Sequence, residues 1–325
     1  MAEKNKVAVV GGDGIGPEVI AEGLRTIQAS GVELDTHQYD LGGSRYLKDK
    51  TILPDSIIAE WAGFDAIYLG AVGHPEITPG IIERGLLLKM RFDLDLYINQ
   101  RPFKTDGHDF VVVRENTEGS YAGEGGVLRK GTPHEVATQG SVNTRMGVER
   151  CIRYAFELAQ KRRNKLTLVH KTNVLSFSGD LWDRTLLDLS QEFPDVAVDY
   201  NHIDAACIYF VNSPEQYDVI VTDNLFGDIL TDLGGAVSGG IGLASSANLN
   251  PTGNGPSMFE PVHGSAPDIA GQNKANPIAA ILSGAMMLEF LGYKEEAARI
   301  TKSCHENSEA TGTTSEIADA VISTL

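Results

Sequence analysis

Residues 6–30 read KVAVVGGDGIGPEVIAEGLRTIQAS and combine the signals of a strand, a tight turn and a helix. The apolar run at 6–10 predicts a short buried strand, and a glycine-rich turn follows it directly. Pro17 and Glu18 are typical of the first turn of a helix, which we expect to continue through 19–30. This stretch therefore predicts a complete strand–turn–helix unit.

The same alternation continues along the chain. Apolar runs bounded by turn residues lie at 66–69, 110–113, 166–169 and 219–222, and helical patterns lie between several of them, for example at 146–160 and 182–191. This order predicts an α/β fold with mostly parallel sheets and flanking helices. The small residues of 234–242 would permit close approach of a ligand or another helix.

Composition excludes several classes of protein. The 325 residues are 42% hydrophobic, enough for a large core, which excludes a disordered or fibrous chain. The net charge of −17 argues against nucleic acid as a partner, because phosphate binding needs a basic surface. No apolar run is long enough for a membrane span, and no signal peptide is recognisable. Cys151, Cys207 and Cys304 lack metal-site spacing, so we expect reduced thiols in a cytoplasmic protein without a membrane partner.

The glycine-rich turn does not match the classical dinucleotide fingerprint. Pro17 stands where GxGxxG requires its third glycine, and no Gly-Lys-Ser/Thr follows to make a phosphate loop. The turn alone leaves two interpretations open, a ligand contact or a tight structural turn.

Three arginines occur in or beside apolar sequence, namely Arg91, Arg101 and Arg114. A guanidinium binds a carboxylate with a planar fork of donors, so the three could clamp a dicarboxylic acid. The alternative is that each pairs with a nearby acid such as Asp93, Asp95 or Glu115.

A group of carboxylates suggests a divalent cation. In TDNLFGDILTD, Asp228 and Asp232 are four residues apart and project from one helix face, and Asp223 precedes them. Like charges on one face are unfavourable unless a cation lies between them, and oxygen ligands favour Mg²⁺ or Mn²⁺. Asp204 is a possible third ligand, and a solvated helix face is the alternative.

Two further side chains have acid–base chemistry. Lys171 follows the run at 166–169 and could be a general base, and Tyr121 lies in a glycine-containing loop as a candidate general acid. The loop 259–277 holds His263 and a lone acid, Asp268, which could accept a hydrogen bond from a ribose hydroxyl. That acid favours NAD over a 2′-phosphorylated cofactor.

Together these segments resemble the β-decarboxylating dehydrogenase family, which includes isopropylmalate, isocitrate, homoisocitrate and tartrate/D-malate dehydrogenases. The resemblance covers nearly the whole chain through GDGIGPE, GLLLKMRFDLDLYINQRP, VVRENTEGSYAG, LVHKTNVL, TDNLFGDILTD, EPVHGSAPDIAG and TGTTSEIADAV, in this order. It implies a two-domain isopropylmalate dehydrogenase-like α/β fold that is not a classical Rossmann fold. The larger, cofactor-binding domain would comprise residues 1–98 and 250–325, and the smaller domain, 99–249, would form a homodimer interface.

The resemblance also implies roles for individual residues. Tyr121 corresponds to the acid that protonates the enol carbon, and Lys171 to the base that takes the proton of the substrate hydroxyl. Lys171 and Asp204 would reach the active site of the other subunit. The metal ligands would be Asp204, Asp228 and Asp232, and the substrate contacts Arg91, Arg101, Arg114, Asp204, Leu86 and Leu87. The cofactor contacts would be Ile15, His263, Gly264, Ser265, Ala266, Pro267, Asp268 and Asn276.

The implied activity is oxidative decarboxylation of a 3-substituted malate with NAD and Mg²⁺ or Mn²⁺, in leucine biosynthesis. Apolar Leu86 and Leu87 favour an isopropyl substituent, and a tartrate/D-malate enzyme is the alternative. We expect one additional residue between Gly85 and Arg91 relative to many members. A regulatory subunit without activity is a further alternative, but such subunits usually lose catalytic residues, and the candidates for this chemistry are all present.

Overall fold

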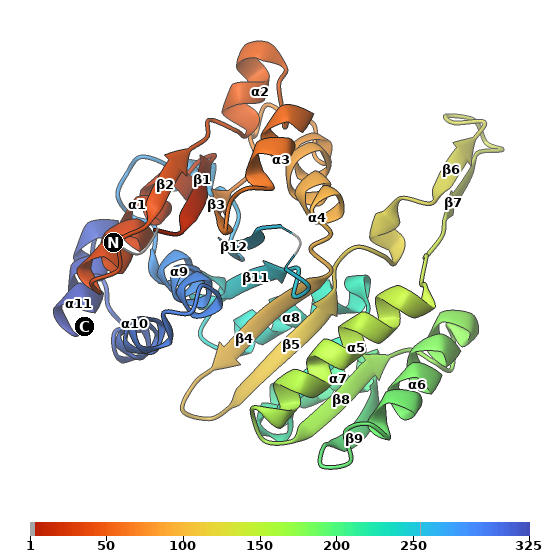
Figure 1. Cartoon of the computed structure of the whole chain (residues 1–325). Coiled ribbons are helices and arrows are strands. Elements are labelled where there is room, and N and C mark those ends of the chain that lie inside the picture. The colour runs from red at the N-terminus through yellow and green to blue at the C-terminus, as the bar shows by residue number, and fades with distance from the viewer. Residues whose placement is uncertain (1–3, 254) are drawn as a thin grey trace. The chain divides into compact units, whose positions relative to one another are not determined.

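The computed structural model describes residues 4–253 and 255–325. The chain divides into two compact units, the first comprising Met1–Leu96 and Ser238–Leu325 and the second Tyr97–Val237 (Figure 1). Each unit contributes its own set of strands and helices, and each is described here by itself.

The strands of the first unit lie in the order β2-β1-β3-β12-β11. Strand β1 pairs in parallel with β2 and β3, β12 is parallel to β3, and β11 is antiparallel to β12. Every residue of β3, β11 and β12 is buried, as expected for strands covered on both faces. The bounds are β1 Lys6–Gly12, β2 Asp35–Gln38, β3 Ala66–Ala71, β11 Ser245–Leu249 and β12 Ser257–Pro261.

Helices cover both faces of these strands. Helix α9 is buried along most of its length because it packs against α1, α10 and the strands β11 and β12, so it has no polar face. The bounds are α1 Gly16–Ala29, α2 Gly43–Asp49, α3 Asp55–Trp61, α4 Lys89–Asp93, α9 Ile278–Phe290, α10 Lys294–Glu306 and α11 Thr314–Ser323. Short helices are η1 Glu83–Leu88, η4 Ile241–Leu243 and η5 Pro267–Ile269.

The strands of the second unit lie in the order β4-β5-β10-β8-β9, with β4 antiparallel to β5 and the other pairs parallel. They are β4 Ile98–Lys104, β5 Asp109–Glu115, β8 Lys165–His170, β9 Ala197–His202 and β10 Val219–Thr222. The helices are α5 Arg145–Gln160, α6 Ser176–Ser190, α7 Ile203–Asn212 and α8 Asn224–Val237, with short η2 Ser120–Ala122 and η3 Pro214–Gln216.

A two-stranded antiparallel arm extends from the second unit (Figure 1). It consists of β6, Gly125–Leu128, and β7, Val136–Gln139, and every residue of both strands is exposed. An isolated hairpin is marginally stable in water, so this arm depends on its attachment to the rest of the unit.

The α/β prediction is confirmed, because the four apolar runs lie in β3, β5, β8 and β10 and the parallel pairs dominate both sets of strands. The first helix has its proline in the first turn, as predicted. The helix predicted at 182–191 begins earlier, at Ser176, because residues 176–181 extend the same pattern. Among the described residues, no helix combines the length and apolar character that a membrane span requires.

Candidate active site

The glycine-rich turn of the first unit is organised by Asp13. Its buried carboxylate accepts hydrogen bonds from the backbone N–H groups of Gly43, Ser44 and Gly73 at 2.7, 3.0 and 3.0 Å. Asp13 thus connects the turn after β1 with the start of α2 and with the loop after β3. Asp13 was not predicted to have a role, although a lone acid inside a glycine-rich turn is a recognisable signal for such a contact.

The same turn meets the loop predicted to bind the cofactor. The N–H of Ile15 donates to the carbonyl of Ser265 at 2.9 Å, and a Cβ added at Gly14 would overlap that carbonyl. Glycine at 14, with φ of 57°, is therefore required both by backbone conformation and by space. The turn is structural where it contacts this loop, and it holds the loop in position.

The loop holds the residues that were predicted to contact the adenosine half of a dinucleotide. The Nε2 atom of His263 is buried and has no hydrogen-bond partner in the described part of the chain. Burial lowers the pKa of His263, which favours the neutral ring at physiological pH. Asp268 is exposed on η5, and Asn276 accepts the N–H of Ile278 at 2.9 Å at the start of α9. Between His263 and Asp268 the loop runs through Gly264, Ser265, Ala266 and Pro267.

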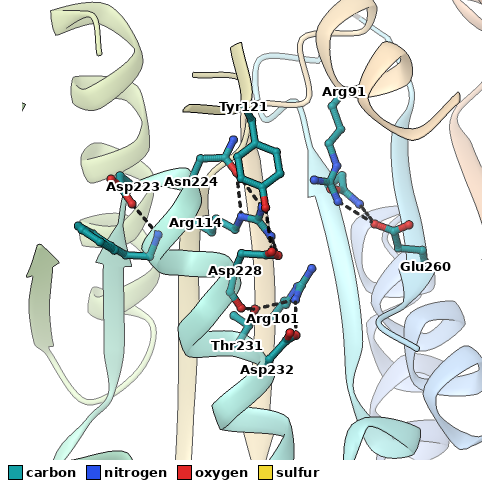
Figure 2. A network of polar contacts seen from close by, with 12 residues as sticks. Arg91, Arg101, Arg114, Tyr121, Asp223, Asn224, Asp228, Thr231, Asp232 and Glu260 are labelled. Atoms are coloured by element: carbon teal, nitrogen blue, oxygen red, sulfur yellow. Dashed lines mark hydrogen bonds and ion pairs between the residues drawn. The ribbon is translucent and has the colours of Figure 1, made fainter. Parts of the chain in front are cut away.

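Arg91, on α4, is buried and pairs with a distant acid (Figure 2). Its Nη2 lies 3.3 Å from Oε1 of Glu260 on β12, and the same oxygen accepts a hydrogen bond from Nδ2 of Asn248 at 2.8 Å. A buried guanidinium needs such partners to offset its desolvation. Glu260 was not predicted, because 169 residues separate it from Arg91.

The segment before Arg91 forms a π-helix, η1, over Glu83–Leu88. A π-turn is the form in which a helix accommodates one extra residue, and the additional residue expected before Arg91 stays a prediction. Leu86 is 0% exposed and packs in the core with Ile82 and Met90. Leu87 and Leu88 are partly exposed. Of the two leucines predicted to touch the substrate, only Leu87 therefore has an accessible side chain.

In the second unit, Arg101 and Arg114 extend from the paired strands β4 and β5 toward α8 (Figure 2). Arg114 is 1% exposed, forms an ion pair with Asp228 through Nη1, and donates from Nε and Nη2 to Oδ1 of Asn224 at 3.1 and 2.7 Å. Arg101 donates from Nη1 to Oγ1 of Thr231 at 2.6 Å. The structure thus brings two of the three predicted arginines to one helix.

The two aspartates on α8, Asp228 and Asp232, are two of the three predicted metal ligands. Burial acts to raise the pKa of Asp228, but the Arg114 charge and the Tyr121 hydrogen bond outweigh it, so that pKa is lowered. Burial and the neighbouring charge of Asp228 raise the pKa of Asp232, which lies 4.0 Å from Nη1 of Arg101. A divalent cation would relieve this repulsion, and two hard oxygen donors one helical turn apart fit Mg²⁺ or Mn²⁺.

Tyr121, on η2, contacts both members of this network. Its hydroxyl donates to Oδ2 of Asp228 at 2.8 Å, and its ring lies 5.1 Å from the Arg114 guanidinium (Figure 2). Burial raises the pKa of Tyr121 above its ordinary value, although the Arg114 charge opposes the shift. The phenol is therefore protonated at neutral pH and can act as a proton donor.

Lys171 and Asp204 form a separate pair. Nζ of Lys171, which follows β8, lies 2.6 Å from Oδ1 of Asp204 in the first turn of α7. The hydrogen bond from Lys171 lowers the pKa of Asp204, whose side chain is 69% exposed. Among residues 4–253 and 255–325, no group of three or more His, Cys, Asp or Glu is arranged to hold a metal ion. Asp204 is therefore not grouped with Asp228 and Asp232 within one chain.

Two buried acids beside the site were not predicted as functional. Glu115 follows Arg114 in β5, and its burial raises its pKa to about 7 although it accepts hydrogen bonds from Thr117 and Glu118. Burial also raises the pKa of Asp223 to about 6, and Oδ2 of this residue lies 3.7 Å from Nε2 of His170. Both acids adjoin a buried apolar strand, and this position in the sequence could have identified them as buried, functionally relevant acids.

Comparison with known proteins identifies the family of the chain. The model of the isocitrate/isopropylmalate dehydrogenase family matches residues 6–324. The 3-isopropylmalate dehydrogenase of Corynebacterium glutamicum is 59% identical over 338 residues, covering 98% of this chain and 99% of the relative. That of Thermobifida fusca is 56% identical, covering 93% and 90%.

Two solved structures have the same fold. The isocitrate dehydrogenase of Methylococcus capsulatus superposes with a TM-score of 0.89 at 36% identity, covering 98% of this chain and 99% of that one. A β-decarboxylating dehydrogenase of Thermococcus kodakarensis, in its apo form, gives a TM-score of 0.83 at 36% identity, with 98% and 96% covered. The chain belongs to the isocitrate/isopropylmalate dehydrogenase family.

Proposed function

We propose that this protein oxidises and decarboxylates 3-isopropylmalate to 4-methyl-2-oxopentanoate and CO₂ with reduction of NAD, a step of leucine biosynthesis. The observation that carries the proposal is the 59% identity, over 98% of this chain, to a relative named 3-isopropylmalate dehydrogenase. We propose that the protein acts in the cytoplasm, a reducing compartment in which free thiols such as those of Cys151, Cys207 and Cys304 are expected.

Three arginines would bind the substrate carboxylates. Arg101 and Arg114 are buried on β4 and β5, and Arg91 is buried on α4. The protein carries a net charge of −17, so an anionic substrate is repelled by the molecule as a whole. Guanidinium groups with little solvent around them provide the local attraction that such a substrate needs.

A divalent cation and NAD would complete the chemistry. Asp228 and Asp232, with Asp204 from the second copy of the chain, would hold Mg²⁺ or Mn²⁺. Ile15 and the loop from His263 to Asp268, with Asn276, would hold NAD. When bound, the cofactor accepts a hydride and the cation polarises the substrate oxygen. The exposed Asp268 carboxylate favours NAD, because it repels a 2′-phosphate.

Proton transfer would be divided between two residues. Lys171 would take the proton of the substrate hydroxyl, and Tyr121 would return a proton to the carbon that loses CO₂. The hydrogen bond from Tyr121 to Asp228 holds the phenol beside the carboxylates of α8. Tyrosine suits the second role because its raised pKa keeps the proton on the oxygen until the carbanionic carbon forms.

The position of the Lys171–Asp204 pair supports the proposal of a homodimer. This pair is held together at 2.6 Å but is not grouped with Asp228 and Asp232 in one chain. We propose that it acts in the active site of the partner subunit, so each site combines residues of two copies. In this scheme the first unit binds NAD and the second unit forms the dimer interface.

A substrate panel tests the proposal. The purified protein is assayed for NADH or NADPH formation with 3-isopropylmalate, D-malate, tartrate and isocitrate, with Mg²⁺ or Mn²⁺ and after chelation. The expected result is the highest kcat/KM with 3-isopropylmalate and NAD, and loss of activity after chelation. A higher kcat/KM with D-malate, tartrate or isocitrate would overturn the substrate assignment, and preference for NADP would overturn the role of Asp268.

A further inference from the structure

One face of α8 alternates charged and neutral polar residues. Asn224, Asp228, Thr231 and Asp232 lie on this face at helical spacing, and the arginines of β4 and β5 approach it (Figure 2). The two aspartates are partly or largely exposed, whereas Asn224 and Thr231 are each 1% exposed. Burial of polar side chains in a helix calls for partners, and both residues have an arginine as partner.

Asn224 fixes the plane of the Arg114 guanidinium. Its Oδ1 accepts from both Nε and Nη2, so a single oxygen holds one edge of the planar group. Its Nδ2 donates to the carbonyl of Glu118 at 3.2 Å, which determines which way the amide points. The orientation of Arg114 is therefore set by an amide that is itself held at both ends.

Thr231 does the same for Arg101. Its hydroxyl donates to the carbonyl of Asp228 at 3.1 Å, which turns an oxygen lone pair toward Nη1 of Arg101 at 2.6 Å. The hydroxyl hydrogen is occupied within the helix, so the oxygen can serve the arginine as an acceptor.

The neutrality of these acceptors has an electrostatic consequence. A carboxylate partner orients an arginine but also cancels its charge, and it would compete with the substrate carboxylate. An amide or hydroxyl orients the guanidinium and adds no negative charge to that of Asp228 beside Arg114 and Asp232 near Arg101. In a chain of net charge −17, each further carboxylate beside these arginines would weaken the local attraction for an anion.

We propose that Asn224 and Thr231 are positioning residues that hold Arg114 and Arg101 in the geometry for binding substrate carboxylates without adding a further negative charge beside either guanidinium. The inference rests on the proposed function to the extent that the substrate is a malate-type dicarboxylate. Neither residue touches the substrate in this scheme. Each acts through its arginine.

Thr231→Val removes the hydroxyl at nearly constant volume, and Thr231→Ser keeps it. Arginines bind carboxylates in the ground state and the transition state alike, so Thr231→Val should raise KM on the order of tenfold with kcat changed by less than about threefold. Thr231→Ser should restore KM to near the wild-type value. Equal impairment of the two variants, or an unchanged KM in Thr231→Val, would overturn the assignment.

Thr185→Val is the matched control. Thr185 is also a buried helical threonine, and its hydroxyl donates to the carbonyl of Leu181 at 2.6 Å, with no arginine partner among the residues that the structure describes. Its loss should lower thermal stability by a similar amount and leave KM unchanged. An equal rise of KM in Thr185→Val would show that lost packing, and not arginine orientation, explains the effect.

Asn224→Asp tests the charge argument separately, because it keeps the acceptor and adds a negative charge beside Arg114. We expect KM to rise on the order of tenfold, with a matching loss of 3-isopropylmalate affinity in calorimetry. A wild-type KM would refute the requirement for a neutral acceptor. Each ratio of variant KM to wild-type KM is measured with the substrate that the wild-type protein prefers. Preference for another malate therefore refutes only the proposed function, and ratios near one refute only the positioning roles.

Discussion

Replacing Gly227 by alanine would move Arg114 with little change in global stability. A Cβ at position 227 would lie 2.7 Å from Cβ and 2.9 Å from Cδ of Arg114, and closer still to Cγ. Nonbonded carbons rest at roughly 3.5–4.0 Å, so one of the two elements must shift by about 1 Å. The crowded atoms are next to the backbone of β5, which is paired on both sides, so a rotamer change cannot relieve them.

The expected consequence is a loss of activity. A misplacement of about 1 Å at an active site costs on the order of 100-fold in rate, so kcat/KM should fall by about that factor. Overpacking costs about 1–3 kcal/mol, and the better helix propensity of alanine offsets roughly 1 kcal/mol of it. The variant should therefore remain folded, which thermal unfolding and circular dichroism would check.

Gly234→Ala is the control for this prediction. Gly234 lies seven residues further along the same helix, where an added Cβ would lie 3.0–3.2 Å from the ring of Phe103. It gains the same helix propensity and crowds an apolar side chain, so stability should change similarly while kcat/KM stays within about threefold. A folded Gly227→Ala protein with wild-type kcat/KM would refute the reasoning, as would an equal loss of activity in Gly234→Ala.

Three further predictions concern other parts of the molecule. The folded state raises the pKa of Glu115 from 4.5 to about 7. The folded protein therefore binds this proton more tightly, and the free energy of unfolding should fall by about 3 kcal/mol between pH 5 and 8. Urea unfolding at both values should show a smaller fall in Glu115→Gln, and an identical fall would contradict the assignment. Leu87→Ser should lower the preference for 3-isopropylmalate over D-malate by roughly 10- to 200-fold. Leu86→Ala should cost about 2–5 kcal/mol of stability at an unchanged preference, and the reverse pattern would refute the π-helix register. Mixing inactive Lys171→Ala and Asp232→Asn proteins under subunit exchange should restore about a quarter of wild-type activity, because mixed dimers hold one intact site each. No restoration would contradict shared sites.

Much of the fold could be predicted because apolar runs and turn residues encode it locally. The runs in β3, β5, β8 and β10 were read from sequence, and Pro17 correctly indicated the first helix. The mismatch to GxGxxG correctly indicated that this turn is not a classical dinucleotide-binding turn. In the structure the turn packs at Gly14 against the backbone of Ser265. Strands and helices could be predicted wherever contiguous residues determine them.

The register before Arg91 could not be predicted in the same way. An extra residue in a helix can be absorbed at either end or as a π-turn, and sequence spacing does not distinguish these outcomes. The π-turn at Glu83–Leu88 turns Leu86 into the core and leaves Leu87 accessible. The choice depends on how neighbouring side chains such as Ile82 pack, which is a property of the folded core.

Neutral positioning residues were missed for a different reason. Aspartates and arginines can be recognised in a sequence as candidate site residues because they are charged. Asparagine and threonine, as at Asn224 and Thr231, are common at helix ends and on protein surfaces, so their presence indicates no particular function. Their importance lies in which side chains approach them, and Arg114 is 110 residues away from Asn224. Such partners become visible only once β4, β5 and α8 are assembled.

The glycines of α8 explain how that assembly is possible. Gly227 lies against the stem of Arg114 on β5, and Gly234 lies against the ring of Phe103 on β4. The small residues predicted at 234–242 to permit close approach thus begin with a contact to a strand side chain. Larger residues would push the helix outward, and the bonds from Asn224 and Thr231 to their arginines, at 2.6–3.1 Å, would lengthen together. Because the acids, the neutral acceptors and the glycines share one helix, the distance of α8 from the strands sets the geometry of the whole cluster.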